Sequence, residues 1–181
     1  MKFLDSESEQ VREVYAYYGL AMYWAQCLEQ SIFQNLLYFD HFPKALKTYT
    51  TPENWAEDFD RYEAQELSQT MGKLIRRLRE IGQPTDSIKD ALSKALKDRN
   101  WLAHGYFADR AIEFTNPEGR TDMLVELNEL RDSFRACAEE LDAISMPAAR
   151  KFGFTEEMLE KVRAEMTSEY ANRKAKAKAK A

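Results

Sequence analysis

The stretch KDRNWLAHGYF, between Lys97 and Phe107, gathers side chains that suit the cleavage of a phosphodiester bond. It holds Arg99, Asn100 and His104, and His104 is one of only two histidines in the chain. The guanidinium of an arginine stays charged and binds phosphate through paired hydrogen bonds. The imidazole of a histidine titrates near neutral pH and can transfer protons. These residue types predict a site that cleaves RNA without a metal ion.

Each of the three polar side chains has an expected role in such a reaction. We expect His104 to take the proton of the 2′-hydroxyl or to protonate the leaving oxygen. Arg99 would hold the phosphate and stabilise the charge that develops on it, and Asn100 would orient the phosphate or the imidazole. Because the 2′-hydroxyl is the nucleophile, the product would carry a 2′,3′-cyclic phosphate and DNA would not be cut.

Helix geometry separates Arg99 from His104. At about 100° per residue these two side chains point about 140° apart, whereas Arg99 and Tyr106 share a face. Asn100 and His104 are neighbours one turn apart. Three arrangements would bring the arginine to the histidine: the arginine bends round, the helix deforms near Gly105, or the two residues come from different molecules. The third arrangement predicts a homodimer with a two-fold symmetric cleft.

Arg99 also interrupts an apolar helix face. That face is formed by Ile88, Leu92, Ala95, Leu96, Leu102, Ala103 and Tyr106. Arginine is rarely buried without a partner, so we expect an anionic group or a water-filled cleft to meet Arg99. Glu29, on the margin of an apolar face nearer the N-terminus, would reach water, pair with a lysine or act as an accessory residue. Tyr106 is either a core residue or an accessory and modification site.

Apolar residues at spacings of three and four predict the helices that carry these side chains. Four main helices are expected over residues 6–38, 52–81, about 85–106 and about 121–145, and a last helix begins at 155. His41 is expected in the loop after the first helix, where Pro43 disfavours helix at the residue before it. Periodicity fails between residues 108 and 120. Ala111 to Phe114 is compatible with a short extended piece, but a strand there would lack a partner.

The second of these helices ends in a basic segment. Lys73, Arg76, Arg77 and Arg79 lie in its last turns, before Gly82. Positive charge suits the negative end of a helix dipole. The same side chains could also bind phosphates, so this segment is either a solvated face or part of an anion site.

Composition limits the classes of protein that the chain can belong to. The 181 residues are enough for one bundle domain, expected over 1–170, followed by a lysine- and alanine-rich flexible tail over 171–181. A net charge of −5 argues against a protein that coats nucleic acid, but allows a locally basic cleft. Cys27 and Cys137 have no neighbours at metal-ligand spacing, so we expect no metal, disulfide or cofactor. No apolar run could span a membrane, and the acidic start lacks a signal-peptide core, so the protein is expected in the cytoplasm.

The motif resembles that of a known family. Arg99 to His104 has the form Arg-x4-His of the HEPN superfamily, including the polar Asn100 after the arginine. With Gly105 and Tyr106 it becomes Arg-x4-His-x-Tyr, similar to HEPN toxins that are paired with minimal nucleotidyltransferases. The long first helix and the helix order also agree with that family. The chain departs from the compact toxins in its length, its 108–120 segment and its additional last helix and tail.

The resemblance implies a small all-α bundle that dimerises, with two Arg/His pairs facing one cleft. It implies a metal-independent endoribonuclease, in the toxin branch with a nucleotidyltransferase antitoxin that can modify the tyrosine, here Tyr106. Members without nuclease activity lead to the alternative, a non-catalytic dimeric module for interaction or ligand sensing. In that case Arg99 and His104 would stabilise a dimer interface or a helix end.

Overall fold

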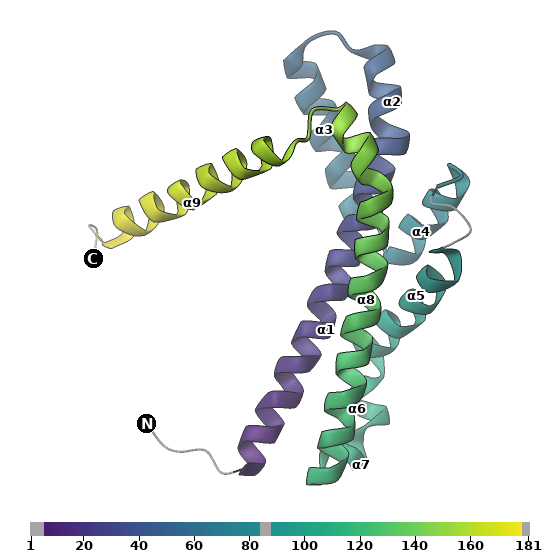
Figure 1. Ribbon diagram of the computed structural model, residues 1–181, viewed down its shortest axis with the longest axis vertical. Helices are drawn as coiled ribbons and strands as arrows, with labels where there is room; N and C mark the ends of the chain where they lie inside the picture. The colour runs from purple at the N-terminus through teal and green to yellow at the C-terminus, as the bar shows by residue number, and fades with distance from the viewer. Residues whose placement is uncertain (1–5, 84–87, 179–181) are drawn as a thin grey trace. The chain divides into compact units, whose positions relative to one another are not determined.

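The structure is a computed structural model that describes residues 6–83 and 88–178 (Figure 1). Within these ranges every regular element is a helix, so the protein is all-α, as predicted. The chain divides into two compact units between Ser145 and Met146. Among the helices of the described ranges, none is long and apolar enough to cross a membrane.

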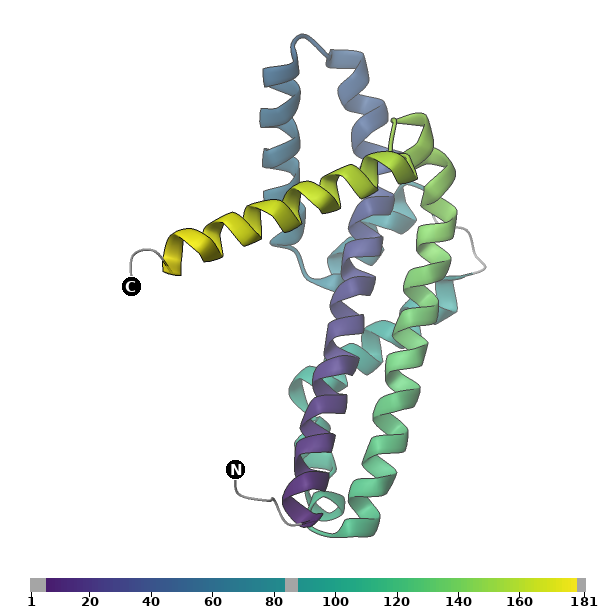
Figure 2. The same ribbon diagram turned by 60° about the vertical axis from the view of Figure 1, so that its left-hand side comes forward.

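Two long helices form the frame of the first unit. Helix α1 (Ser6–Leu36) begins at the predicted residue, and α8 (Pro117–Lys151) runs alongside it up to Ser145 in both views (Figures 1 and 2). The predicted stripe of α1 is buried at Val14, Ala21, Ala25, Leu28 and Ile32. The facing residues of α8 are buried at Met123, Leu127, Phe134 and Leu141. Spacings of three and four therefore predicted the contact faces of both helices correctly.

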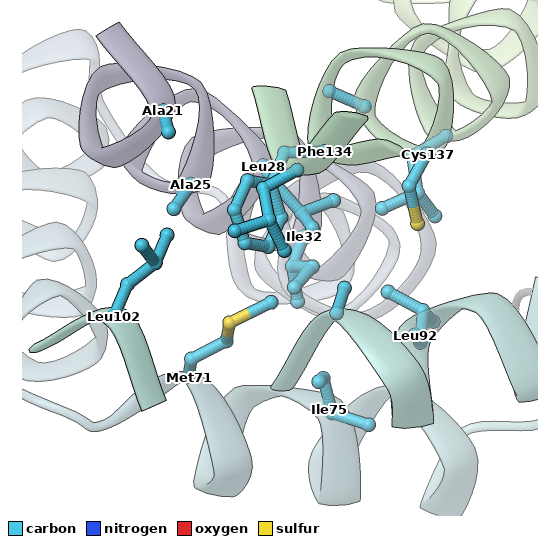
Figure 3. Packing of buried hydrophobic residues seen from close by; sticks show 14 of the residues in the cluster. Ala21, Ala25, Leu28, Ile32, Met71, Ile75, Leu92, Leu102, Phe134 and Cys137 are labelled. Carbon is cyan, nitrogen blue, oxygen red and sulfur yellow. The ribbon is translucent and has the colours of Figure 1, made fainter. Parts of the chain in front are cut away.

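Two shorter helices complete the core of this unit. Helix α4 (Met71–Glu80) and helix α5 (Lys89–His104) both contact α1. Met71 of α4 and Leu102 of α5 lie close to the α1 side chains in the packed cluster, which also includes Phe134 of α8 (Figure 3). The predicted start of the third helix near Thr85 lies outside the described residues. The motif helix is thus fixed by its apolar face to the longest helices of the unit.

The predicted break after the first helix is wrong. The chain stays helical through a π-helical turn, η1 (Leu37–His41), a short α2 (Phe42–Ala45) and a 3₁₀ turn, η2 (Leu46–Thr48). The wide turn closes where the N–H of Phe42 donates to the carbonyl of Leu37. Pro43 has no N–H for the usual bond one turn back, and its ring would crowd that carbonyl in a normal α-turn. Widening the helix accommodates the proline without ending the helix.

The predicted second helix is two helices in the structure. Helix α3 (Pro52–Leu67) begins as expected, because the Thr51 hydroxyl accepts the N–H of Asn54 at 3.3 Å. It ends at Leu67 because Ser68 and Gln69 both donate side-chain hydrogen bonds to the carbonyl of Gln65. Such bonds compete with helix continuation. Gly82, with φ of 70°, follows the end of α4 in the left-handed conformation that glycine adopts most readily.

The segment between α5 and α8 is helical and not extended. It forms two single-turn helices, α6 (Tyr106–Asp109) and α7 (Ala111–Phe114). Arg110, between them, donates two hydrogen bonds to Glu126 of α8, at 2.9 and 2.6 Å. Helix α8 begins at Pro117, four residues before the predicted start, with the Asn116 side chain accepting the N–H of Gly119 at 2.7 Å. This short link holds the end of the motif against α8.

The second unit begins at Met146, within α8. The predicted end of the fourth helix at about residue 145 is wrong, because α8 continues to Lys151 with Pro147 inside it. The last helix, α9 (Glu156–Lys178), starts as predicted, with the Thr155 hydroxyl accepting the N–H of Met158 at 3.2 Å. It extends into the residues expected as a tail, and its side chains from 171 to 176 are exposed.

Candidate functional site

Arg99 is met by an anionic group, as predicted. Its Nη2 lies 3.0 Å from Oε1 of Glu29 on α1, and both side chains are about one quarter exposed. The partner of Glu29 is therefore an arginine and not the lysine considered from the sequence. Glu29 and Arg99, each a charged residue on an apolar helix face, thus stabilise each other where α1 meets α5.

The end of α5 is fixed to α1 by a second polar contact. Tyr18 of α1 donates its hydroxyl hydrogen to the carbonyl of Leu102 at 3.0 Å, and the Leu102 side chain is buried. The backbone stays α-helical through His104, and the N–H of Gly105 donates to the carbonyl of Trp101 at 2.8 Å. The helix therefore presents its motif residues in a regular α-helical arrangement.

Asn100 and His104 lie on the exposed side of α5. The Asn100 side-chain oxygen accepts a hydrogen bond of 3.3 Å from Arg99. Among the described residues, His104 makes no hydrogen bond or ion pair, and neither kind of contact joins it to Arg99. The arginine reaches toward α1, and the helix keeps its form up to His104. An arrangement in which Arg99 meets the His104 of a second molecule stays a prediction.

Tyr106 lies in the core. Its side chain is 1% exposed, its hydroxyl donates to the carbonyl of Met123 at 3.4 Å, and its ring lies 5.0 Å from the ring of Trp101. Burial is the main cause that raises the pKa of this hydroxyl, with Glu126 adding to the effect. Modification of Tyr106 stays a prediction, and it would require α6 to open.

A second charged cluster was missed by the sequence analysis. Asp40 of the π-turn and Glu66 of α3 are both buried, and Arg77 of α4 donates to both. The distance from Arg77 Nη2 to Asp40 Oδ2 is 3.2 Å, and Lys44 also forms an ion pair with Asp40. The Arg77 guanidinium therefore joins three helical elements that are separated in the sequence: the π-turn η1, α3 and α4.

A signal for this cluster was present in α3. Trp55, Phe59, Tyr62 and Glu66 follow each other at spacings of four, three and four, so Glu66 lies on the apolar face of the helix. The next residue, Leu67, is 45% exposed, whereas Glu66 is fully buried. An acid in register with an apolar stripe is the same signal that identified Glu29.

Two aromatic residues cover the cluster. The His41 ring stacks on the Tyr62 ring with centroids 4.0 Å apart, and the Arg77 guanidinium lies 5.8 Å from the Tyr62 centroid. Burial raises the pKa of Tyr62 to about 12, and burial lowers the pKa of His41. Within the described residues the Tyr62 hydroxyl and Oε2 of Glu66 are buried and have no hydrogen-bond partner. Within the described residues, the Tyr62 hydroxyl can therefore still donate a hydrogen bond, and Oε2 of Glu66 can still accept one.

Cys27 and Cys137 do not form a disulfide with each other. Both are free, and burial raises the pKa of the Cys137 thiol to about 11. In the described ranges no group of three or more His, Cys, Asp or Glu side chains is arranged to hold a metal ion. The candidate groups for chemistry are the arginines, His104 and the carboxylates.

A comparison of the chain with models of known families, with curated proteins and with solved structures finds no match. The resemblance to the HEPN superfamily consequently rests on the Arg-x4-His-x-Tyr residues and on the helical class.

Proposed function

We propose that this protein is a metal-independent endoribonuclease of the HEPN type that acts as a homodimer, as the toxin of a toxin–antitoxin or defence system. The proposal rests on a contrast between the surroundings of two residues of α5, Arg99 and His104. The guanidinium of Arg99 is held by Glu29, whereas His104, five residues on, is exposed without a polar partner in the described part of the chain. Phosphodiester cleavage requires a positioned cation and a free imidazole in one cleft, and two copies of this helix facing each other would supply both.

The reaction uses two copies of the motif in one cleft. His104 of one molecule takes the proton of the 2′-hydroxyl, whose oxygen attacks the phosphorus. The bond from phosphorus to the 5′-oxygen breaks, and the histidine from the second molecule gives that oxygen a proton. The products are a 2′,3′-cyclic phosphate and a free 5′-hydroxyl. Arg99 stabilises the additional negative charge on the phosphoryl oxygens while these bonds change.

Glu29 acts in this scheme as a positioning residue. A guanidinium has five N–H donors, and one carboxylate cannot use them all. The pair with Glu29 therefore limits the motion of the Arg99 side chain and leaves donors for a phosphate. Asn100, which accepts a hydrogen bond from the same guanidinium, adds a second restraint.

An RNA cleavage assay in EDTA tests the proposal. Wild-type protein should produce 2′,3′-cyclic phosphate ends, and His104→Ala and His104→Gln should both lower the rate by about 10²-fold or more, because neither side chain titrates. Arg99→Ala should have a comparable effect, whereas Arg12→Ala, which removes an exposed charge from α1, should leave the rate unchanged. Equal cleavage by the wild type and the His104 variants would exclude the assignment.

A mixed dimer tests the dimeric cleft separately. In a heterodimer of the wild-type chain with an Arg99→Ala/His104→Ala chain, one of the two histidines that the reaction uses is missing. If the cleft is shared, this heterodimer should cleave RNA at least about tenfold more slowly than the wild-type dimer. A rate of about half that of the wild-type dimer would mean that each chain cleaves RNA by itself, and would refute the shared cleft.

The alternative is a non-catalytic dimeric module for interaction or ligand sensing. The Arg99–Glu29 ion pair favours it, because this contact alone could account for a charged residue on an apolar face. A module of this kind would cleave no RNA, and Arg99→Ala would change the dimer mass or the binding of a partner. A nucleotidyltransferase that modifies the protein in a purified mixture would support the toxin proposal.

A further inference from the structure

Helix α9, a single continuous helix, carries an exposed apolar face (Figure 1). Five large apolar or aromatic side chains are between 40% and 66% exposed there: Met158, Leu159, Val162, Met166 and Tyr170. At about 100° per residue they lie within about 120° of the helix circumference, an arc that contains only one charged residue between positions 158 and 170, Glu169. Most of the stability of a helix in a protein comes from the packing of such a face. We therefore expect a partner to cover it.

The spacing of this face fits a second copy of the same helix. Met158, Val162, Met166 and Tyr170 follow each other at spacings of four, so the series is symmetric about residue 164. In an antiparallel pair centred on residue 164, Met158 of one copy lies opposite Tyr170 of the other, and Val162 lies opposite Met166. Every large side chain of the series then meets another one, and a two-fold axis relates the two copies.

The charges of α9 favour the same antiparallel orientation. Residues 156–165 contain four acidic and two basic side chains, a net charge of −2, and residues 166–176 contain three basic and one acidic side chain, a net charge of +2. An antiparallel pair places each half against the half of opposite charge, whereas a parallel pair in register would place like charges together. Within the described residues, none of these charged side chains forms an ion pair in the single chain. They are thus available to a second copy.

Particular charged side chains meet in this register, because identical sides of two antiparallel helices face each other. On one side of the apolar face, Lys161 of one copy is level with residue 167 of the other, about 3 Å along the axis from both Glu165 and Glu169. On the other side, Glu156 of one copy is level with residue 172 of the other, the same axial distance from Lys174. Each contact occurs twice in the pair. Such flanking charges determine the orientation and register of paired helices.

We propose that α9 is a self-association surface, which pairs antiparallel with α9 of a second copy of this chain. The face comprises few large side chains, and interfaces of small area are weak. We therefore expect association at micromolar or higher concentrations. The surface is distinct from the cleft proposed at α5, and the pairing does not depend on nuclease activity.

Sedimentation equilibrium of the full chain tests the surface. Met166→Lys places a charge in the middle of the apolar face and should weaken self-association at least about tenfold. Ala164→Lys is the matched control, because Ala164 is exposed on the same helix, about 180° from the centre of the face, and receives the same charge. Its association constant should equal that of the wild type. Both replaced side chains are exposed, so both variants should keep the circular dichroism spectrum of the wild type.

Three results would overturn the proposal. A wild-type chain that stays monomeric at millimolar concentration does not associate through α9, and a lower thermal midpoint of Met166→Lys would then mean that α9 covers its own chain. A monomeric chain that binds phosphatidylserine vesicles, with binding lost in Met166→Lys, would assign the face to a membrane surface. Equal association of the wild type and Met166→Lys would mean that the copies meet through another surface. None of these results bears on RNA cleavage, which the His104 variants test.

Disulfide cross-linking tests the orientation of the pair. Val162→Cys and Met166→Cys chains, both with Cys27→Ala to remove the more exposed natural thiol, are mixed and oxidised. Antiparallel pairing should join one chain of each kind, because position 162 of one copy lies opposite position 166 of the other. Intact mass measurement distinguishes this product from two identical chains joined together. A majority of cross-links between identical chains would refute the antiparallel pair.

Discussion

The protein contains two arginines that join helices, and their surroundings differ. Arg99 pairs with one carboxylate, Glu29, which is about one quarter exposed. Arg77 pairs with two carboxylates, Glu66 and Asp40, whose side chains are 0% and 8% exposed. A partly hydrated ion pair is weak and leaves donors of its guanidinium free for another anion, whereas buried carboxylates need their cation to remain folded. The comparison favours Arg99 for the proposed chemistry and Arg77 as a structural anchor.

The largest effect is expected from removal of the anchor. Arg77→Met leaves two buried carboxylates without their cation, and we expect the free energy of unfolding to fall by about 3 kcal/mol. Urea unfolding measured by circular dichroism would detect this loss. Arg79→Met, on the same helix and exposed, should change stability by at most about 0.5 kcal/mol. If the two variants unfold at the same urea concentration, Arg77 does not anchor these helices.

A smaller effect is expected at the other arginine. Arg99→Met and Glu29→Gln should each lower the free energy of unfolding by about 1 kcal/mol or less, because water screens a partly exposed pair. The double variant should show a coupling of similar size, and the coupling should shrink in 1 M salt. A coupling above about 2 kcal/mol would make this pair as structural as the Arg77 cluster and would weaken the case for catalysis. The same urea titrations measure all three variants.

The two clusters also differ in how far the sequence predicts them. One turn and a half of a single helix contains Arg99, Asn100 and His104. Their spacing in the sequence alone therefore identifies them as a candidate site. The sequence also predicted that an anion meets Arg99, because a charge on an apolar face needs a partner. It did not identify Glu29 as that anion, because the partner depends on how α1 and α5 pack.

The Arg77 cluster could not be predicted in the same way. Asp40, Glu66 and Arg77 come from three elements, and their meeting depends on the π-turn and on the helix break at 68–70. The π-turn comes from Pro43, which lacks a backbone N–H, and the helix break comes from Ser68 and Gln69, whose side chains compete for the carbonyl of Gln65. Apolar periodicity is insensitive to both effects, so it predicted the helix faces and missed the two features that form the Arg77 cluster.

The smallest effect at neutral pH is expected from Tyr62→Phe. The hydroxyl of Tyr62 is buried without a hydrogen-bond partner in the described part of the chain, so its removal should change stability by less than about 1 kcal/mol or increase it. Burial raises the pKa of Tyr62 to about 12, from about 10 in the unfolded chain. The folded state thus favours the neutral phenol, and this contribution is complete below pH 10 and is lost as the pH rises toward 12. Tyr62→Phe should therefore lose less stability than the wild type over this interval in parallel urea titrations. A clear loss at pH 7 would mean that the hydroxyl has a hydrogen-bond partner, either the neighbouring Arg77 guanidinium or an ordered water.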